Sequence, residues 1–142
     1  MEPMKHISIL SLCFFFILTL GAQAQELLKV QAFHSIATGR GGIKTPTYLK
    51  FEEQLNRGRK ARGVFRKCLK KGTPAAKLYG ALGLYHLNKP EGEQALTSLL
   101  GNQDPLPILR GCIISETTVG ALSKDFLDGT GKLVTFRMFL PN

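Results

Sequence analysis

The sequence predicts a mainly α-helical protein: a small, single-domain helical bundle, to which the two chain ends could add a two-stranded β element. Two observations favour helices. Apolar residues recur at intervals of three and four between residues 47 and 100, and three prolines stand at positions where helices commonly begin. A third observation concerns the ends. Apolar residues alternate along residues 26–36 and 132–140, which predicts one strand at each end, with a short helix as the alternative for residues 26–36. We expect these two strands to pair.

Residues 1–24 have the composition of a secretory signal peptide. Lys5 gives a positive start, and the apolar run that follows is shorter than the roughly 20 residues needed to cross a bilayer. Ala22 and Ala24 are small residues of the kind that signal peptidase recognises, so we expect cleavage after Ala24. Residues 25–142 would then form a secreted or periplasmic domain with no membrane span. Their length suffices for one hydrophobic core and not for two.

A strongly basic helix is predicted at residues 57–71. Its apolar residues are spaced i, i+3, i+4, i+7 and i+8, which predicts one buried stripe. The stripe consists of Ala61, Val64, Phe65, Cys68 and Leu69. A shorter helix over residues 47–56 precedes it and follows Pro46. Gly72 occupies the position of a C-terminal helix cap.

Residues 75–87 are predicted to form a central, buried helix because apolar side chains occupy nearly every side of it. Thr73 is a suitable N-cap, and Pro74 suits the first helical position. Gly80 and Gly83 each cost about 1 kcal/mol of helix stability relative to alanine. Such a cost is usually offset where a neighbouring backbone approaches closely, so we expect a close contact at these two positions.

The rest of the chain is divided by turn residues into shorter elements. A helix over residues 90–100 begins at Pro90, where Glu91 suits the positive end of the helix dipole. Residues 106–114 fit either a helix or a buried strand, and the pattern does not choose between them. Residues 115–127 predict a last helix. Its buried residues would be Val119, Leu122 and Phe126.

Residues 72–83 and 101–112 can be superimposed as a faint internal repeat. Each follows a leucine-rich helix, and each enters the next element through a capping residue and a proline before a base, Lys77 or Arg110. Over residues 59–115 this layout resembles two units of a HEAT-type helical repeat. The resemblance implies a short stack of helices that acts as a scaffold for protein contacts and performs no chemistry. An ordinary bundle that uses proline caps twice would produce the same pattern.

No pattern in the sequence indicates a catalytic residue, a metal site or a cofactor. The glycine-rich segment 38–45 lacks the spacing of a P-loop, because Ile43 separates the last glycine from Lys44. His34 and His86 are not spaced with the cysteines in the manner of zinc ligands. The carboxylates form no pair suited to acid–base catalysis.

Two cysteines, Cys68 and Cys112, remain after the predicted cleavage. Exported proteins enter oxidising compartments, so we expect these two residues to form a disulfide. The bridge would close a loop of about 44 residues and contribute about 3–4 kcal/mol to stability. Two buried free thiols are the alternative.

The formal net charge of +9 favours anionic partners. Eight cations are concentrated in the helix over residues 57–71. These candidate polyanion-binding residues are Arg57, Arg59, Lys60, Arg62, Arg66, Lys67, Lys70 and Lys71. The same cations could also be the solvated face of an amphipathic helix without any partner.

The leading functional expectation is a small exported helical protein that serves as a protein-interaction or scaffold module. The alternative is an envelope or extracellular protein that binds an acidic polymer through the basic helix. A further alternative is a secreted enzyme inhibitor or enzyme. The expected partner is therefore an unknown protein or an acidic polymer, and we do not expect nucleic acid to be the physiological ligand outside the cell.

Overall fold

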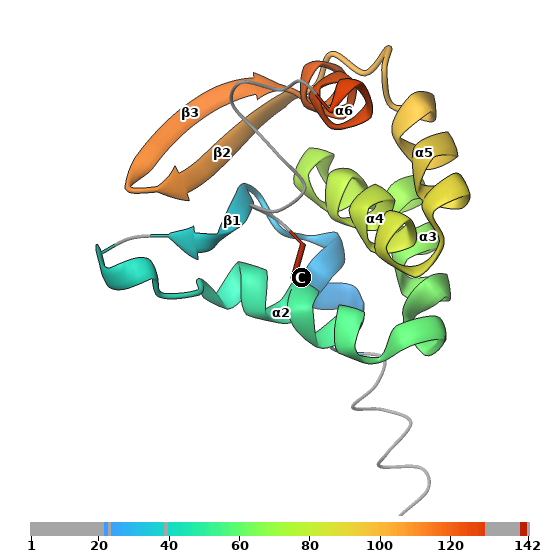
Figure 1. Cartoon of the computed structure of the whole chain (residues 1–142), viewed down its shortest axis with the longest axis horizontal. Helices are drawn as coiled ribbons and strands as arrows, with labels where there is room; N and C mark the ends of the chain where they lie inside the picture. The colour runs from blue at the N-terminus through green and yellow to red at the C-terminus, as the bar shows by residue number, and fades with distance from the viewer. Residues whose placement is uncertain (1–21, 23, 39, 130–139, 142) are drawn as a thin grey trace, which may run out of the picture.

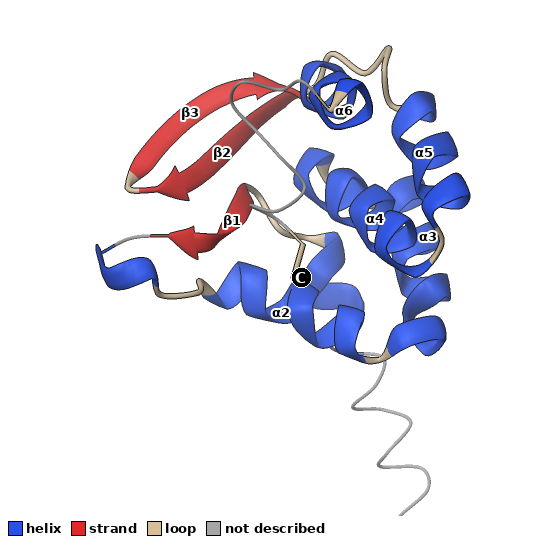
Figure 2. Cartoon of the chain, in the orientation of Figure 1, coloured by secondary structure: helices blue, strands red, loops and turns tan. Residues whose placement is uncertain are grey.

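Figure 1 shows the computed structural model of the chain, which describes residues 22, 24–38, 40–129 and 140–141. The fold is mainly helical, as predicted, and includes a small three-stranded sheet. In Figure 2 the strands gather on one side of the molecule, and helices α3 and α5 lie on the other. The elements are, in chain order, β1 (Phe33–Thr38), the 3-10 turn η1 (Arg40–Gly42), α2 (Pro46–Asn56), the 3-10 turn η2 (Gly58–Ala61), α3 (Arg62–Lys71), α4 (Pro74–Leu87), α5 (Lys89–Ser98), β2 (Pro105–Gly111), β3 (Ile113–Thr118) and α6 (Val119–Asp128).

Helix α4 lies at the centre of the fold, as its apolar composition predicted. It contacts α2, α3, α5, α6, β1 and β2, and its residues from Leu78 to Leu84 are all buried. Its two glycines lie against α3. A Cβ atom added to Gly80 would stand 2.6 Å from the carbonyl oxygen of Phe65, and one added to Gly83 would overlap the Phe65 ring. The expected close contact is therefore confirmed.

An aromatic cluster joins the sheet to the helices. The ring of Tyr79 on α4 lies 4.6 Å from the ring of Phe33 on β1 and 4.7 Å from the ring of Phe51 on α2, measured between centroids. Phe65 on α3 and Phe126 on α6 extend the cluster at tilted or edge-on angles, the arrangement that aromatic pairs prefer. Side chains from five elements thus form one core.

Threonine and asparagine caps begin the helices at defined residues. The hydroxyl of Thr45 accepts a hydrogen bond from the Tyr48 amide, and that of Thr73 accepts one from the Ala76 amide. Both caps are followed by a proline at the first helical position, as predicted for Thr73. The side chain of Asn88 caps α5 in the same way. These caps satisfy amide groups that have no partner within the helix.

The segment that the pattern left open, residues 106–114, is a strand hairpin. β2 lies between β1 and β3, parallel to β1 and antiparallel to β3. Leu106 and Ile108 on β2 are buried against the helices. Pro105 and Pro107, which lack an amide proton, precede the residues of β2 that pair with β1, and this is where a strand tolerates proline.

The last helix is shorter than the prediction of residues 115–127. Residues 115–118 belong to β3, and α6 begins only at Val119. The Thr118 hydroxyl caps α6 by accepting a hydrogen bond from the Ala121 amide. Backbone pairing with β2, opposite Pro105, extends the strand to Thr118. The three side chains expected to be buried, Val119, Leu122 and Phe126, are buried.

The prediction for the N-terminal strand was wrong in its bounds. Residues 24–28 are helical, and the strand is β1, which begins at Phe33. Its partner among the described residues is β2. The tail proposed to pair with it, residues 132–140, lies outside the described residues apart from Leu140, which is buried in the core. The signal peptide likewise lies outside them, apart from Ala22 and Ala24.

The HEAT-like layout does not extend to a second unit. The pair α3–α4 has the helix–turn–helix form, but Arg110, expected on a helix, lies on β2. A strand in this place obtains its backbone hydrogen bonds from β1 and β3, which local periodicity cannot reveal. The fold is therefore a helical cluster packed beside a sheet.

Candidate functional site: the basic face of helix α3

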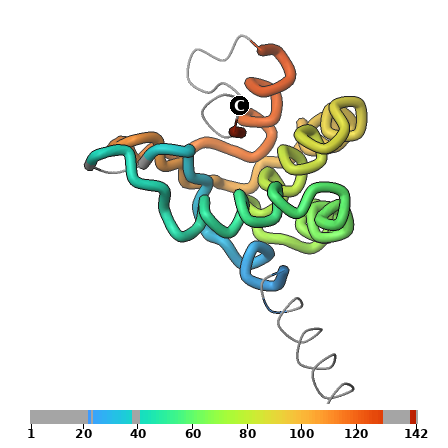
Figure 3. Tube along the Cα trace, turned by 60° about the horizontal axis from the view of Figure 1, so that its bottom comes forward, coloured from blue at the N-terminus to red at the C-terminus, as the bar shows by residue number. Residues whose placement is uncertain are grey.

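Seven of the eight predicted cations are exposed, and Arg57 is half-buried. We call these residues the basic face: Arg57, Arg59, Lys60, Arg62, Arg66, Lys67, Lys70 and Lys71. The predicted helix over residues 57–71 is divided in the structure: Arg57 follows α2, Arg59 and Lys60 lie in η2, and α3 begins only at Arg62. The five remaining cations are exposed because α3 buries its opposite side, where Phe65 and Cys68 pack against α4 with no exposed surface. In Figure 3 this segment lies at the end of the molecule opposite the β2–β3 hairpin.

A carboxylate from α5 neutralises part of the basic face. Glu91 lies between two arginines one helical turn apart, with its Oε2 atom 2.5 Å from Arg62 Nη2 and its Oε1 atom 2.7 Å from Arg66 Nη2. Arg66 Nε also donates a hydrogen bond to Oε1 at 2.8 Å. We call Arg62, Glu91 and Arg66 the ion-pair triad. Glu91 follows Arg66 by 25 residues, so the local sequence around these bases does not reveal this partner.

The triad holds Glu91 in its charged form. The hydrogen bond from Arg62 is the largest influence that lowers the pKa of Glu91, and Arg66 adds to it against the effect of burial. The side chain of Glu91 is only 18% exposed, so the two guanidinium groups replace much of its hydration. Because the three residues come from α3 and α5, the triad also joins these two helices.

Five cations of the basic face have no acidic partner among the described residues. They are Arg59, Lys60, Lys67, Lys70 and Lys71. Arg57 donates a hydrogen bond to the side-chain oxygen of Gln54 at 2.9 Å, a neutral partner. The positive charge available to a ligand is therefore smaller than the sequence suggested, and it lies mainly on lysines.

The predicted disulfide is not formed in the structure, where Cys68 and Cys112 are both free. Cys68 faces α4 from α3, and burial raises the pKa of its thiol to about 12. Cys112 is exposed between β2 and β3, at the opposite end of the molecule from α3 (Figure 1). The fold thus directs the two side chains to separate places, and the buried thiol is protonated and unreactive at neutral pH.

The two histidines among the described residues, His34 and His86, have different surroundings. Nδ1 of His34 lies 2.7 Å from the hydroxyl of Thr45, the residue that caps α2. The hydroxyl of Tyr79 accepts a hydrogen bond from the His34 amide and donates one to its carbonyl. Burial lowers the pKa of His34. His34 therefore fastens β1 to α2 and α4, whereas His86 is exposed.

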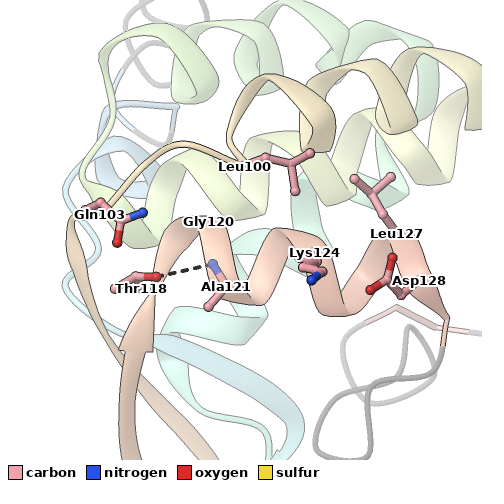
Figure 4. Close-up of a pocket in the computed structure, with 8 residues that line it drawn as sticks. All are labelled: Leu100, Gln103, Thr118, Gly120, Ala121, Lys124, Leu127 and Asp128. Atoms are coloured by element: carbon pink, nitrogen blue, oxygen red, sulfur yellow. Dashed lines mark hydrogen bonds between the residues drawn. The ribbon is translucent and has the colours of Figure 1, made fainter.

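A shallow pocket of about 470 Å³ lies beside α6, as Figure 4 shows. Its lining residues are Leu100, Gln103, Thr118, Gly120, Ala121, Lys124, Leu127 and Asp128. The Thr118 hydroxyl is engaged as the cap of α6, and the lining contains no histidine or cysteine. The ionisable side chains of the lining are Lys124 and Asp128.

Within the part of the chain that the structure describes, no three His, Cys, Asp or Glu side chains are grouped as metal ligands. In the same residues, no helix has both the length and the hydropathy needed to cross a membrane.

Comparison with known proteins finds no matching family model, no similar curated protein and no similar solved structure. The basic face is therefore the surface on which a functional proposal can be built.

Proposed function

We propose that this protein is exported and binds anionic polymers through the basic face of α3. The observation that carries the proposal is the set of five exposed cations with no acidic partner in the described chain. Arg59 and Lys60 lie in the 3-10 turn η2, and Lys67, Lys70 and Lys71 lie on α3, whose other side is buried in the core. An array of cations held by a folded helix gains affinity by releasing the counterions that surround a polyanion.

Retention on a heparin column at rising salt tests this function. The variant Lys67→Gln/Lys71→Gln should elute at a clearly lower salt concentration, because it removes two contacts. The control, Lys50→Gln/Lys124→Gln, removes the same charge from α2 and α6. It should elute close to the wild-type protein. If the elution salt concentration fell equally in both variants, net charge alone would cause retention, and the proposal would then fail.

Export is proposed on the basis of the N-terminal sequence and supported by the core. Leu27 is buried in the core, and Thr73 donates hydrogen bonds to the carbonyl groups of Leu28 and Val30. Cleavage after Ala24 would keep these contacts. N-terminal sequencing of the protein from its native source should therefore begin at Gln25. A cytoplasmic protein that retains Met1 would contradict the proposal.

A second candidate function, protein interaction, is favoured by a different surface. Ile113 and Ile114 in the hairpin are 63% and 75% exposed, and Ile43, which follows η1, is 72% exposed. The pairing of Thr38 with Gly111 places η1 and the hairpin turn at the same end of the sheet. Exposed apolar side chains near one end of a sheet are a feature of contact surfaces. Capture of a partner by the wild-type protein should be lost in Ile113→Thr/Ile114→Thr, while capture that persists in this variant would exclude the hairpin.

A further inference from the structure

The basic face contains two sets of cations, which differ in whether they contact an acidic side chain. The arginines of the ion-pair triad, Arg62 and Arg66, are four residues apart and point toward α5, since both contact Glu91. Lys67 and Lys71 are also four residues apart. Each residue turns the helix by about 100°, so the two lysines lie about 100–140° around α3 from Arg66. Lys60 lies in η2, the 3-10 turn that precedes α3. We call Lys60, Lys67 and Lys71 the lysine row.

The two sets differ in what an incoming anion would meet. At the triad, a ligand phosphate or sulfate would approach Glu91, a carboxylate whose pKa is lowered and which already uses both guanidinium groups. The ligand would have to displace Glu91 or be repelled by it. The lysines meet no such obstacle, because each is exposed and none has an acidic partner among the residues described.

We infer that the lysine row is the contact surface for a linear polyanion, and that the triad is a structural link that withholds Arg62 and Arg66 from the ligand. This inference rests on the proposed function and names its ligand class. From Lys60 in η2 to Lys71 at the end of α3, the row spans about 16–18 Å of helical rise. Only a polymer whose anionic groups repeat over that length can contact all three lysines at once.

The chemistry of lysine narrows the ligand further. An arginine binds a planar or tetrahedral oxyanion through two parallel hydrogen bonds, whereas a lysine ammonium acts as a compact point charge. A row of lysines therefore recognises the spacing and density of charges, and it does not distinguish a phosphate polymer from a sulfated one. The expected ligand class is a flexible, linear phosphate or sulfate polymer.

Two variants with the same change of formal charge separate the row from the triad. Lys67→Gln removes one positive charge, and Arg62→Gln/Arg66→Gln/Glu91→Gln removes two positive charges and one negative. The measurement is the slope of log Kd against log salt for long-chain polyphosphate and for heparin. Lys67→Gln should reduce the slope by about 0.7–0.9, the value of one lost contact. The triple variant should retain the wild-type slope.

The outcomes distinguish this inference from the proposed function. If the wild-type protein binds neither polymer, the proposed function fails and the inference fails with it. If it binds, but the triple variant loses as much slope as Lys67→Gln, the arginines contact the ligand and only the inference is overturned. If the protein bound only polyphosphate or only heparin tightly, the expectation that the lysine row does not distinguish phosphate from sulfate polymers would be wrong.

A second variant keeps the test valid if the triple variant does not fold. Glu91→Gln frees the arginines without removing any cation, so its slope should become steeper by about 0.7–1.8. An unchanged slope would contradict the withholding role of Glu91. The length requirement is tested with tripolyphosphate, which is too short to reach all three lysines and should bind at least about tenfold more weakly than the long chain. Equal affinities would exclude the extended row.

Discussion

Gly80 of α4 lies directly against the backbone of α3 at Phe65. A Cβ atom at position 80 would stand 2.6 Å from the Phe65 carbonyl oxygen and 2.9 Å from the Leu69 amide nitrogen. Both atoms belong to a helix backbone and cannot rotate away. This contact sets how closely the two helices approach, and α3 in turn presents the basic face.

Gly80→Ala should therefore destabilise the protein by about 1–3 kcal/mol, because overpacking exceeds the gain in helix propensity. The matched control is Gly63→Ala on α3, where an added Cβ meets nothing within 4 Å. That variant should be unchanged or up to about 1 kcal/mol more stable. Urea unfolding measures both, and a stabilised Gly80→Ala would show that α3 and α4 are not packed as described.

Loss of the Glu91 carboxylate should destabilise the protein in a pH-dependent way. The lowered pKa of Glu91 means that its contribution is complete above its ordinary pKa of 4.5 and is lost as the pH falls through the folded-state value. Glu91→Gln should cost about 1 kcal/mol at pH 7. The difference in unfolding free energy from the wild type should shrink below pH 4.5.

Glu93→Gln is the control for this experiment. Glu93 is an exposed residue of the same helix, and its Oε1 atom lies 3.8 Å from the Nζ atom of Lys89, one turn earlier. Exposed pairs of this kind contribute about 0.3–0.5 kcal/mol. A Glu93 variant as unstable as Glu91→Gln would indicate that general surface charge, rather than the ion-pair triad, causes the effect.

His34 should make stability fall in mildly acidic solution. Burial lowers the pKa of His34, so the unfolded chain binds the proton more readily than the folded protein. The contribution is complete above the ordinary pKa of 6.5 and decreases as the pH falls below it. His34→Asn, which retains a polar atom for Thr45, should lack this decrease in thermal melts. The exposed-site variant His86→Asn should retain it.

Cys68 and Cys112 should differ in reactivity toward iodoacetamide. Cys112 is exposed and should be labelled in the folded protein, whereas Cys68 is buried with its pKa raised to about 12 and should be labelled only after unfolding. Peptide mass spectrometry before and after denaturation measures both sites. A Cys68–Cys112 disulfide peptide from the oxidised protein would contradict the structure.

Most of the helical part of the fold could be predicted from local sequence. The stripe of α3, the apolar surroundings of α4 and the Thr73 cap depend on residues three or four positions apart, so periodicity and capping preferences reveal them. The close contact at Gly80 was also predictable, because a glycine within a buried helix implies a neighbour. The exposure of the cations followed from the position of the apolar stripe.

Elements that depend on distant partners could not be predicted in the same way. β2 contains short apolar runs that suit either a helix or a strand. It forms a strand because it pairs with β1, where Phe33 lies opposite Ile108, 75 residues later in the chain. The strand β3 and the late start of α6 follow from that pairing. The disulfide was wrong because spacing in sequence does not report the separation of two side chains in space.

The sequence by itself determined that α3 would be amphipathic, with a buried stripe and a cationic surface, because both follow from the order of residues along one helix. Only the tertiary structure decided how much of that charge is available to a ligand. Glu91 reaches Arg62 and Arg66 from α5 because α3 and α5 both lie beside α4. The electrostatic potential at a surface depends on all charges that lie near it in space. Arg66 and Glu91 are 25 residues apart in the chain, so they come into contact only when their helices pack.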